Sequence, residues 1–240
     1  NHEAEIRAAI DNDDDVERMD QYCGEAYMAR AIAYWELIRL FTKAYDKNTA
    51  NQELGVVLND EYDTQNTPRR ATLQQSFDHL LNDIAPAQNF LQLDKDQTAK
   101  TVSLCDYSYF TEYTAHALRA RVALYMGDWD EAIKWSSKVI DSNFYVLSSP
   151  TSGYYASDDL AYLWQYDCGT EVIWKVEYTS TSYGYSTGAV FFNYDYSSYK
   201  PDYVPAQWVL NLYDSNDMRY DTYYQSLTTG HPHGLTWPLF

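Results

Sequence analysis

Apolar residues recur at helical spacing through the first 147 residues of the chain and lose that period afterwards. From Gly24 to Phe41, apolar side chains occupy nearly every face, which predicts a helix buried among other helices. From Thr72 to Leu91 they recur three and four positions apart, behind a capping box formed by Thr72 and Gln75. Residues 1–10 predict a shorter helix.

Two further features of these helices can be predicted. The helix over 24–41 has a small-residue face, which is expected to pack closely against a neighbour and consists of Ala26, Ala29 and Ala33. Pro86 is expected to kink the helix over 72–91 or to end it early, because proline lacks the backbone N–H that a helix interior needs.

A helix pair over 112–126 and 130–142 organises this part of the chain. Gly127 suits the left-handed residue that ends the first helix, and Asp128 can cap the second, with Glu131 completing a capping box. Ala120 and Ala132 stand where the two helices would approach closely. The spacing resembles a tetratricopeptide pair, and an ordinary antiparallel helix hairpin is the alternative. Either pair needs neighbouring helices to bury both its faces.

The remainder of the chain predicts loops with a few short elements. Residues 43–70 read as a long surface loop. Residues 171–178 alternate apolar and polar side chains, which predicts a strand. Pro205 is expected to start a short helix that Trp208 and its apolar neighbours dock on the core. We therefore expect a mainly α protein, with a tetratricopeptide-like helical lobe over 1–147 and a loop-rich, aromatic lobe over 148–240 that contains a few short strands.

Composition narrows the function classes. The formal net charge of −18 repels phosphate backbones and anionic lipid, so nucleic-acid binding is not expected. The chain has 25 tyrosines and seven tryptophans, which is more than a core of this size requires. Its three cysteines are far apart and predict neither a metal site nor a disulfide framework.

Two short stretches partly resemble metal sites. The acidic run of residues 11–15 begins like a calcium loop, but Val16 and Tyr22 occupy the positions that require Gly and Glu, so it reads as a loop or a helix start. His231 and His233 could bind a metal, but no third ligand is suggested, and a plain turn is the alternative. We expect no metal and no cofactor, and no apolar run is long enough to span a membrane.

Several segments, taken in order, resemble the SusD-like (SusD/RagB) family. These are Gly24-Glu25-Ala26 with Arg30-Ala31, Arg69–Ala71 with Phe77 and Asp83, the helix pair around Gly127-Asp128-Trp129, Glu171–Trp174, and Tyr203-x-Pro205 through Leu212-Tyr213 to Asp217-x-Arg219. The family normally begins with a lipidated cysteine and ends in further tetratricopeptide helices. The resemblance therefore implies that this chain is a portion of a longer protein.

The resemblance implies a non-catalytic protein that binds oligosaccharide at the bacterial cell surface. Such a protein is anchored to the outer membrane through an N-terminal lipid absent from this chain, and it delivers glycan to a TonB-dependent SusC-like transporter. A tetratricopeptide-type scaffold for protein interactions is the alternative. A glycosidase was also considered, but the 35 acidic residues make some carboxylate pair inevitable, and none of the common hydrolase or phosphate-binding motifs occurs. We expect no catalytic residues.

The segment over 179–203 is the predicted glycan site, because exposed aromatic rings beside polar groups can bind sugars. Its candidate residues are Tyr183, Tyr185, Asn193, Tyr194, Asp195, Tyr196 and Tyr199. The alternative is that these tyrosines cover the helical lobe as additional core. The loop over 43–70, with Tyr45 and Tyr62, is a second candidate.

Overall fold

The computed structural model describes residues 2–60, 65, 67–91, 108–149, 160–166, 169–176, 203–228 and 236–239. The chain forms two compact units. We call residues 1–146 with 172–175 the helical unit, and residues 147–171 with 176–240 the second unit. The protein is mainly helical, as predicted, and no helix in the described part is long and apolar enough to cross a membrane.

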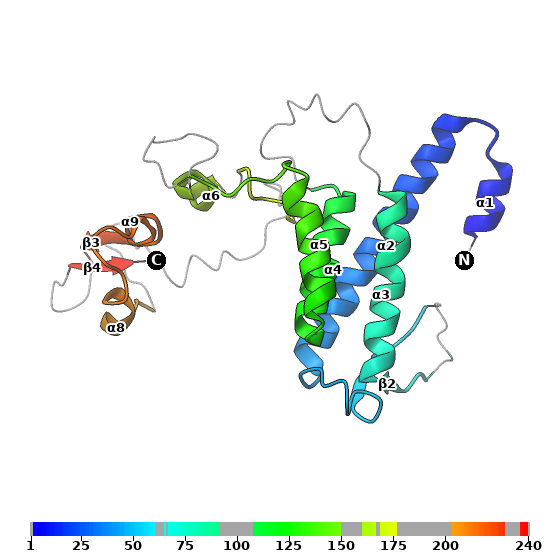
Figure 1. The fold of residues 1–240 in the computed structure, drawn as a ribbon, viewed down its shortest axis with the longest axis horizontal. Coiled ribbons are helices and arrows are strands. Elements are labelled where there is room, and N and C mark those ends of the chain that lie inside the picture. The colour runs from blue at the N-terminus through cyan, green and yellow to red at the C-terminus, as the bar shows by residue number, and fades with distance from the viewer. Residues whose placement is uncertain are drawn as a thin grey trace. The chain divides into compact units, whose positions relative to one another are not determined.

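The helical unit is a bundle in which neighbours in the chain pack side by side (Figure 1). Its helices are α1 (Glu3–Ala9), α2 (Asp13–Phe41), α3 (Leu73–Phe90), α4 (Glu112–Met126) and α5 (Trp129–Asp141). Helix α3 packs along α2, α4 along α3, and α5 along α4. The fully buried core includes Met28 of α2, Leu80 and Ile84 of α3, and Val122 of α4.

Helix α2 begins earlier than the apolar pattern indicates. The Asn12 side chain accepts a hydrogen bond of 2.9 Å from the Asp15 backbone N–H, and three aspartates in the first turn favour the positive end of the helix dipole. The acidic run is therefore a helix start, one of the two alternatives that the sequence left.

The prediction for the small-residue face of α2 is wrong. Ala26, Ala29 and Ala33 are exposed, while the opposite stripe is buried and consists of Gly24, Met28, Ala31, Trp35 and Ile38. Both stripes have helical spacing, but the second removes far more apolar area from water, and burial stabilises in proportion to that area.

The start of α3 is confirmed and its expected early end is not. Thr72 Oγ1 accepts a hydrogen bond of 3.1 Å from the Gln75 N–H, and Gln75 Oε1 accepts one of 3.0 Å from the Thr72 N–H, which completes the capping box. Pro86 lies inside the helix, which continues to Phe90. Beyond Pro86, Ala87 and Leu91 are buried, so packing supports the last turn.

The turn between α4 and α5 matches its prediction at the glycine. Gly127 has φ of +72°, and the N–H groups of Gly127 and Asp128 donate to the carbonyls of Leu124 and Ala123. Asp128 caps α5 by accepting a bond of 3.2 Å from the Glu131 N–H. The Glu131 side chain does not complete a capping box, because it binds Lys134 and Trp135 instead.

The close approach of α4 and α5 at Ala120 and Ala132 stays a prediction. Ala115 and Ala123 are buried, whereas Ala120 of α4 and Ala132 of α5 are only partly buried.

A short hairpin interrupts the loop expected over 43–70, so the prediction of an unstructured surface loop is wrong there. Strand β1 (Leu54–Val57) pairs antiparallel with β2 (Arg70–Thr72), and the register shifts between its two ends. Gly55 and Val56 are buried, and the Val56 N–H donates to Ser76 Oγ of α3 at 3.0 Å.

The second unit contains α6 (Leu160–Tyr166), α8 (Gln207–Leu210), α9 (Met218–Tyr223) and two strands, β3 (Gln225–Thr228) and β4 (Thr236–Leu239). The strands form an antiparallel pair in which Gln225 faces Leu239. Neither strand was predicted from the sequence. The short helix expected after Pro205 is present, but it starts two residues later, at Gln207.

The strand predicted over 171–178 is wrong for the residues that the structure describes there, 171–176, which lie in turn and irregular backbone. Trp174 packs back on the helical unit instead. Its ring stacks on Phe110 with centroids 5.0 Å apart, and its indole N–H donates to the Ser108 carbonyl at 3.1 Å. Trp174 thus contacts the segment that leads into α4 and does not lie on one face of a sheet.

Candidate functional site

The seven residues predicted to bind glycan lie outside the described residues and stay predictions. The same holds for Tyr62 and for the two histidines of the candidate metal pair. Tyr45, the other aromatic residue of the second candidate loop, is not an exposed platform. Its hydroxyl donates to Gln74 Oε1 at 2.6 Å, and its ring packs on Phe77 with centroids 4.9 Å apart.

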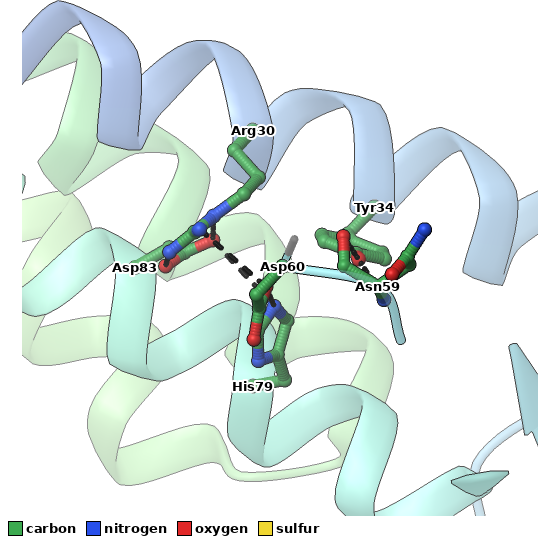
Figure 2. A network of polar contacts seen from close by, with 6 residues as sticks. All are labelled: Arg30, Tyr34, Asn59, Asp60, His79 and Asp83. Carbon is green, nitrogen blue, oxygen red and sulfur yellow. Dashed lines mark hydrogen bonds and ion pairs between the residues drawn. The ribbon is translucent and has the colours of Figure 1, made fainter. Parts of the chain in front are cut away.

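A polar network joins α2, α3 and the residues that follow β1 (Figure 2). Arg30 of α2 donates from Nε to Asp83 Oδ2 at 2.8 Å and from Nη2 to Asp83 Oδ1 at 2.6 Å. The Asp83 carboxylate is buried, and its hydrogen bonds raise the pKa of Arg30. Arg30 also lies 3.4 Å from Asp60 Oδ1, so one guanidinium contacts two carboxylates.

The same network holds Asn59 and Asp60 against the helices (Figure 2). The Tyr34 hydroxyl accepts from the Asn59 N–H at 2.9 Å and donates to the Asn59 carbonyl at 3.3 Å. His79 Nε2 lies 3.2 Å from Asp60 Oδ1, and the His79 ring meets the Tyr34 ring edge-on. These contacts fix the chain where it leaves β1, which gives the network an anchoring role.

A second polar cluster surrounds Trp135 on α5. Its indole N–H donates to Glu131 Oε2 at 2.7 Å, and three cations lie 4.4, 4.9 and 4.7 Å from its ring, namely Arg119, Lys134 and Lys138. Such cation–π contacts stabilise a partly exposed site by about 0.5–1 kcal/mol each. The cluster ties α4 to α5.

His116 of α4 stacks on Trp135 with ring centroids 5.1 Å apart. It is buried, and its Nδ1 has no hydrogen-bond partner among the described residues. Burial, and then the positive charges of Lys138 and Arg119, lower the pKa of His116 to about 4. The imidazole is therefore neutral at neutral pH.

Aromatic residues gather in the second unit around α9. The rings of Tyr213, Tyr220 and Tyr224 contact one another with centroids 5.6 to 6.0 Å apart. Burial, followed by a hydrogen bond with Tyr213, raises the pKa of Tyr224 to about 12. Trp164 of α6 packs on Tyr223 with centroids 4.4 Å apart.

The Asp217-x-Arg219 motif closes this cluster at the start of α9. Asp217 Oδ1 accepts from the Arg219 N–H at 3.1 Å and from Arg219 Nε at 2.9 Å, while Oδ2 accepts from Nη2 at 2.6 Å. The Arg219 guanidinium lies over the Tyr213 ring at 5.9 Å. The hydrogen bonds from Arg219 lower the pKa of Asp217, so this carboxylate is committed to capping and ion pairing.

Helix α8 presents an exposed face that the sequence assigned to the core. Leu210 is buried as expected, but Trp208 is 68% exposed and Leu212 is also exposed. Gln207 and Asn211 are exposed beside them, and Gln207 Nε2 donates to Asn211 Oδ1 at 2.9 Å. The face therefore combines a tryptophan ring with two amides. The sequence feature that could have identified this face is the lack of charged residues on either side of Trp208.

No group of three or more His, Cys, Asp or Glu side chains in the described part of the chain could hold a metal ion. In the second unit, the described feature that suits ligand binding is an aromatic ring with polar groups beside it, at Trp208.

Comparison with known proteins gives a consistent result. Residues 6–124 match the SusD-like family model described as "Starch-binding associating with outer membrane". The SusD-like protein P38 of Formosa agariphila is 26% identical in an alignment 222 residues long, which covers 88% of this chain and 38% of that protein.

Solved structures share the fold. A SusD superfamily protein of Bacteroides thetaiotaomicron has a TM-score of 0.71 at 22% identity, over 97% of this chain and 49% of its own. Surface glycan-binding protein A of Bacteroides uniformis has a TM-score of 0.61 at 17% identity, over 90% of this chain and 46% of its own. The chain thus spans about half the length of these structures and less of the curated relative.

Proposed function

Because the chain belongs to the SusD-like family, described as starch-binding and associated with the outer membrane, we propose that it binds carbohydrate at the bacterial cell surface without cleaving it. The observation that carries this proposal is the family match over residues 6–124, which spans α1 to most of α4. The similar structures include a protein named as glycan-binding and another named as a putative sugar-binding protein, and both share the fold.

The resemblance implies that the protein delivers bound oligosaccharide to a transporter. In this proposal a lipid anchor outside the present chain holds the protein to the outer membrane. The bound oligosaccharide then passes to a SusC-like TonB-dependent transporter. The family's association with the outer membrane supports the location.

The chemistry of the second unit supports sugar recognition. Sugars bind proteins through C–H faces that stack on aromatic rings and through hydroxyls that need polar partners. We place the main contacts at the predicted loop residues, which are Tyr183, Tyr185, Asn193, Tyr194, Asp195, Tyr196 and Tyr199. Their support is composition: tyrosine recurs among amide and carboxylate side chains.

The engaged carboxylates support binding without hydrolysis. A glycosidase needs one carboxylic acid that holds its proton near neutral pH. Asp83 is bound at both oxygens by Arg30, and Asp217 is bound at both oxygens by Arg219. The hydrogen bonds from Arg219 lower the pKa of Asp217, which disfavours proton donation by that carboxylate.

A glycan array probed with the purified chain tests the proposal, followed by calorimetric titration of each hit and chromatography of the bound sugar. We expect binding to at least one oligosaccharide and recovery of that sugar intact. Shortened products would show a glycosidase. If the chain binds no saccharide, the proposal is wrong.

One observation favours a protein-interaction scaffold as the second candidate. Helix α5 carries an exposed apolar face that consists of Trp129, Ile133 and Ile140. A pulldown with the parent chain and a Trp129→Ala variant, read together with the glycan array, separates the two functions. The scaffold predicts a protein partner that is lost with Trp129 and no saccharide binding.

A further inference from the structure

One side of helix α8 is buried and the other side is exposed to solvent. Pro205 and Leu210 are buried, and the Ala206 carbonyl accepts from the Val209 N–H at 2.9 Å and the Leu210 N–H at 3.3 Å. Trp208 and Leu212 lie four residues apart and thus on one side of this turn, where both are exposed. The Trp208 ring is therefore carried on a supported turn.

The two amides beside the ring form an ordered pair. Gln207 Nε2 donates to Asn211 Oδ1 at 2.9 Å, which orients both side chains. Among the residues that the structure describes, Gln207 Oε1 and Asn211 Nδ2 make no hydrogen bond. The pair therefore offers one acceptor and one donor to a ligand. Two neighbouring sugar hydroxyls present the complementary set, because each hydroxyl both donates and accepts.

The charge around this face points to a neutral ligand. No charged residue occurs between Asp202 and Asp214, in a chain whose formal net charge is −18. An anionic sugar or a phosphate would find no cation in this stretch. A neutral sugar needs only a flat apolar face and hydrogen-bond partners, and both are present at Trp208 and the amide pair.

We propose that the exposed face of α8 is a subsite for a neutral oligosaccharide, in which Trp208 stacks on one sugar ring while Gln207 and Asn211 bind its hydroxyls. The inference rests on the proposed carbohydrate-binding function and adds a site apart from the predicted loop residues. It also specifies the class of sugar, because the subsite would bind uncharged hexose or pentose units.

Calorimetric titration of the full chain with maltoheptaose, cellohexaose, xylohexaose and hexagalacturonic acid tests this subsite. We expect the parent to bind at least one of the three neutral sugars and to bind the acidic one more weakly. Trp208→Ala should weaken binding of that neutral sugar about fivefold or more, and Trp208→Phe, which keeps an aromatic face, should retain most of it. The double variant Gln207→Ala/Asn211→Ala should weaken binding about two- to tenfold.

Tyr22→Ala is the control, since Tyr22 is 65% exposed and belongs to the helical unit. It should bind as the parent does. Equal thermal unfolding of all variants will show that they are folded, as expected for exposed side chains. If the parent binds a neutral sugar and Trp208→Ala binds it equally well, the subsite is wrong and the proposed function stands. If the parent binds no saccharide on this panel or on the array, both are wrong. A preference for hexagalacturonic acid would overturn the neutral specificity.

Discussion

Arg30 and Asp83 are 53 residues apart in the chain and form two hydrogen bonds, of 2.8 and 2.6 Å, between α2 and α3. The Asp83 side chain is only 3% exposed, while Arg30 is 38% exposed. A buried carboxylate is costly unless it is paired, so the arginine compensates a charge that the core could not otherwise hold. The pair also contacts Asp60, and so links helix packing to the chain after β1.

Arg30→Met should therefore destabilise the fold by about 2–4 kcal/mol, because it removes both hydrogen bonds that Arg30 donates to the buried Asp83 carboxylate. Urea unfolding measures this free energy. Arg39→Met is the control, since Arg39 pairs with Glu36 on the surface of the same helix, and its loss should cost much less than the loss of Arg30. Equal losses in the two variants would contradict the assignment.

Gly55→Ala should be destabilising by about 1–3 kcal/mol. A Cβ at this position would collide with Ser76 Oγ and with the backbone carbonyl of Thr72, and the backbone cannot move aside as a flexible side chain can. Gly127→Ala provides the comparison: a Cβ there meets no atom within 4 Å, but φ is +72°. Strain alone predicts about 1–2 kcal/mol at Gly127. If Gly55→Ala has the same melting temperature as the parent chain, β1 does not approach α3 as closely as described.

Stability should fall as pH drops from about 6.5 to about 4 because of His116. Its pKa is lowered from 6.5 to about 4 in the folded chain, chiefly by burial, so the unfolded chain binds the proton more readily. Its contribution is therefore full above pH 6.5 and is lost as pH falls towards 4, by about 1–3 kcal/mol in total.

His116→Phe keeps a ring against Trp135 and cannot titrate. The difference in unfolding free energy between parent and variant, followed over this pH window, isolates the histidine from the carboxylates that titrate nearby. A constant difference between parent and His116→Phe across the window would show that His116 is not buried as described.

Alanine substitution tests the predicted loop site. If stacking of an exposed ring stabilises binding by about 1 kcal/mol, each of Tyr183→Ala, Tyr194→Ala, Tyr196→Ala and Tyr199→Ala should weaken glycan binding roughly fivefold. Replacing two or three together should abolish it. Tyr22→Ala is a control, because Tyr22 is exposed on α2 and should leave affinity unchanged. Parent-like binding by all four folded variants would place the site elsewhere.

Local signals predicted the helices well. The capping box at Thr72, the left-handed Gly127 and the Asp128 cap each depend on residues within one turn of each other, so the sequence contains the whole interaction. The buried face of α2 was not predictable in this way. The alanine stripe and the Met28–Trp35 stripe have the same period, and only packing against α3 chooses between them.

Non-local contacts account for the other differences. The pairing of β1 with β2 joins short segments through an irregular register, and the partner of Trp174 lies 66 residues earlier in the chain. Nothing in the local pattern specifies either. The Arg30–Asp83 network could not be predicted for the same reason, since a charged residue on one helix does not indicate its partner on another helix. At α8 the apolar pattern was read as a docking face, but Trp208 points to solvent and only Leu210 is buried.

Trp174 has a consequence for how the chain can vary. The chain leaves the helical unit after residue 146 and returns to it for residues 172–175, where Trp174 is held by Phe110 and Ser108. Residues 147–171 therefore form an excursion with both ends fixed. For such a closed loop, each doubling in length costs only about 0.6 kcal/mol of chain entropy. Insertions and deletions between the two fixed ends can thus remodel the second unit while the helices and their packing stay the same.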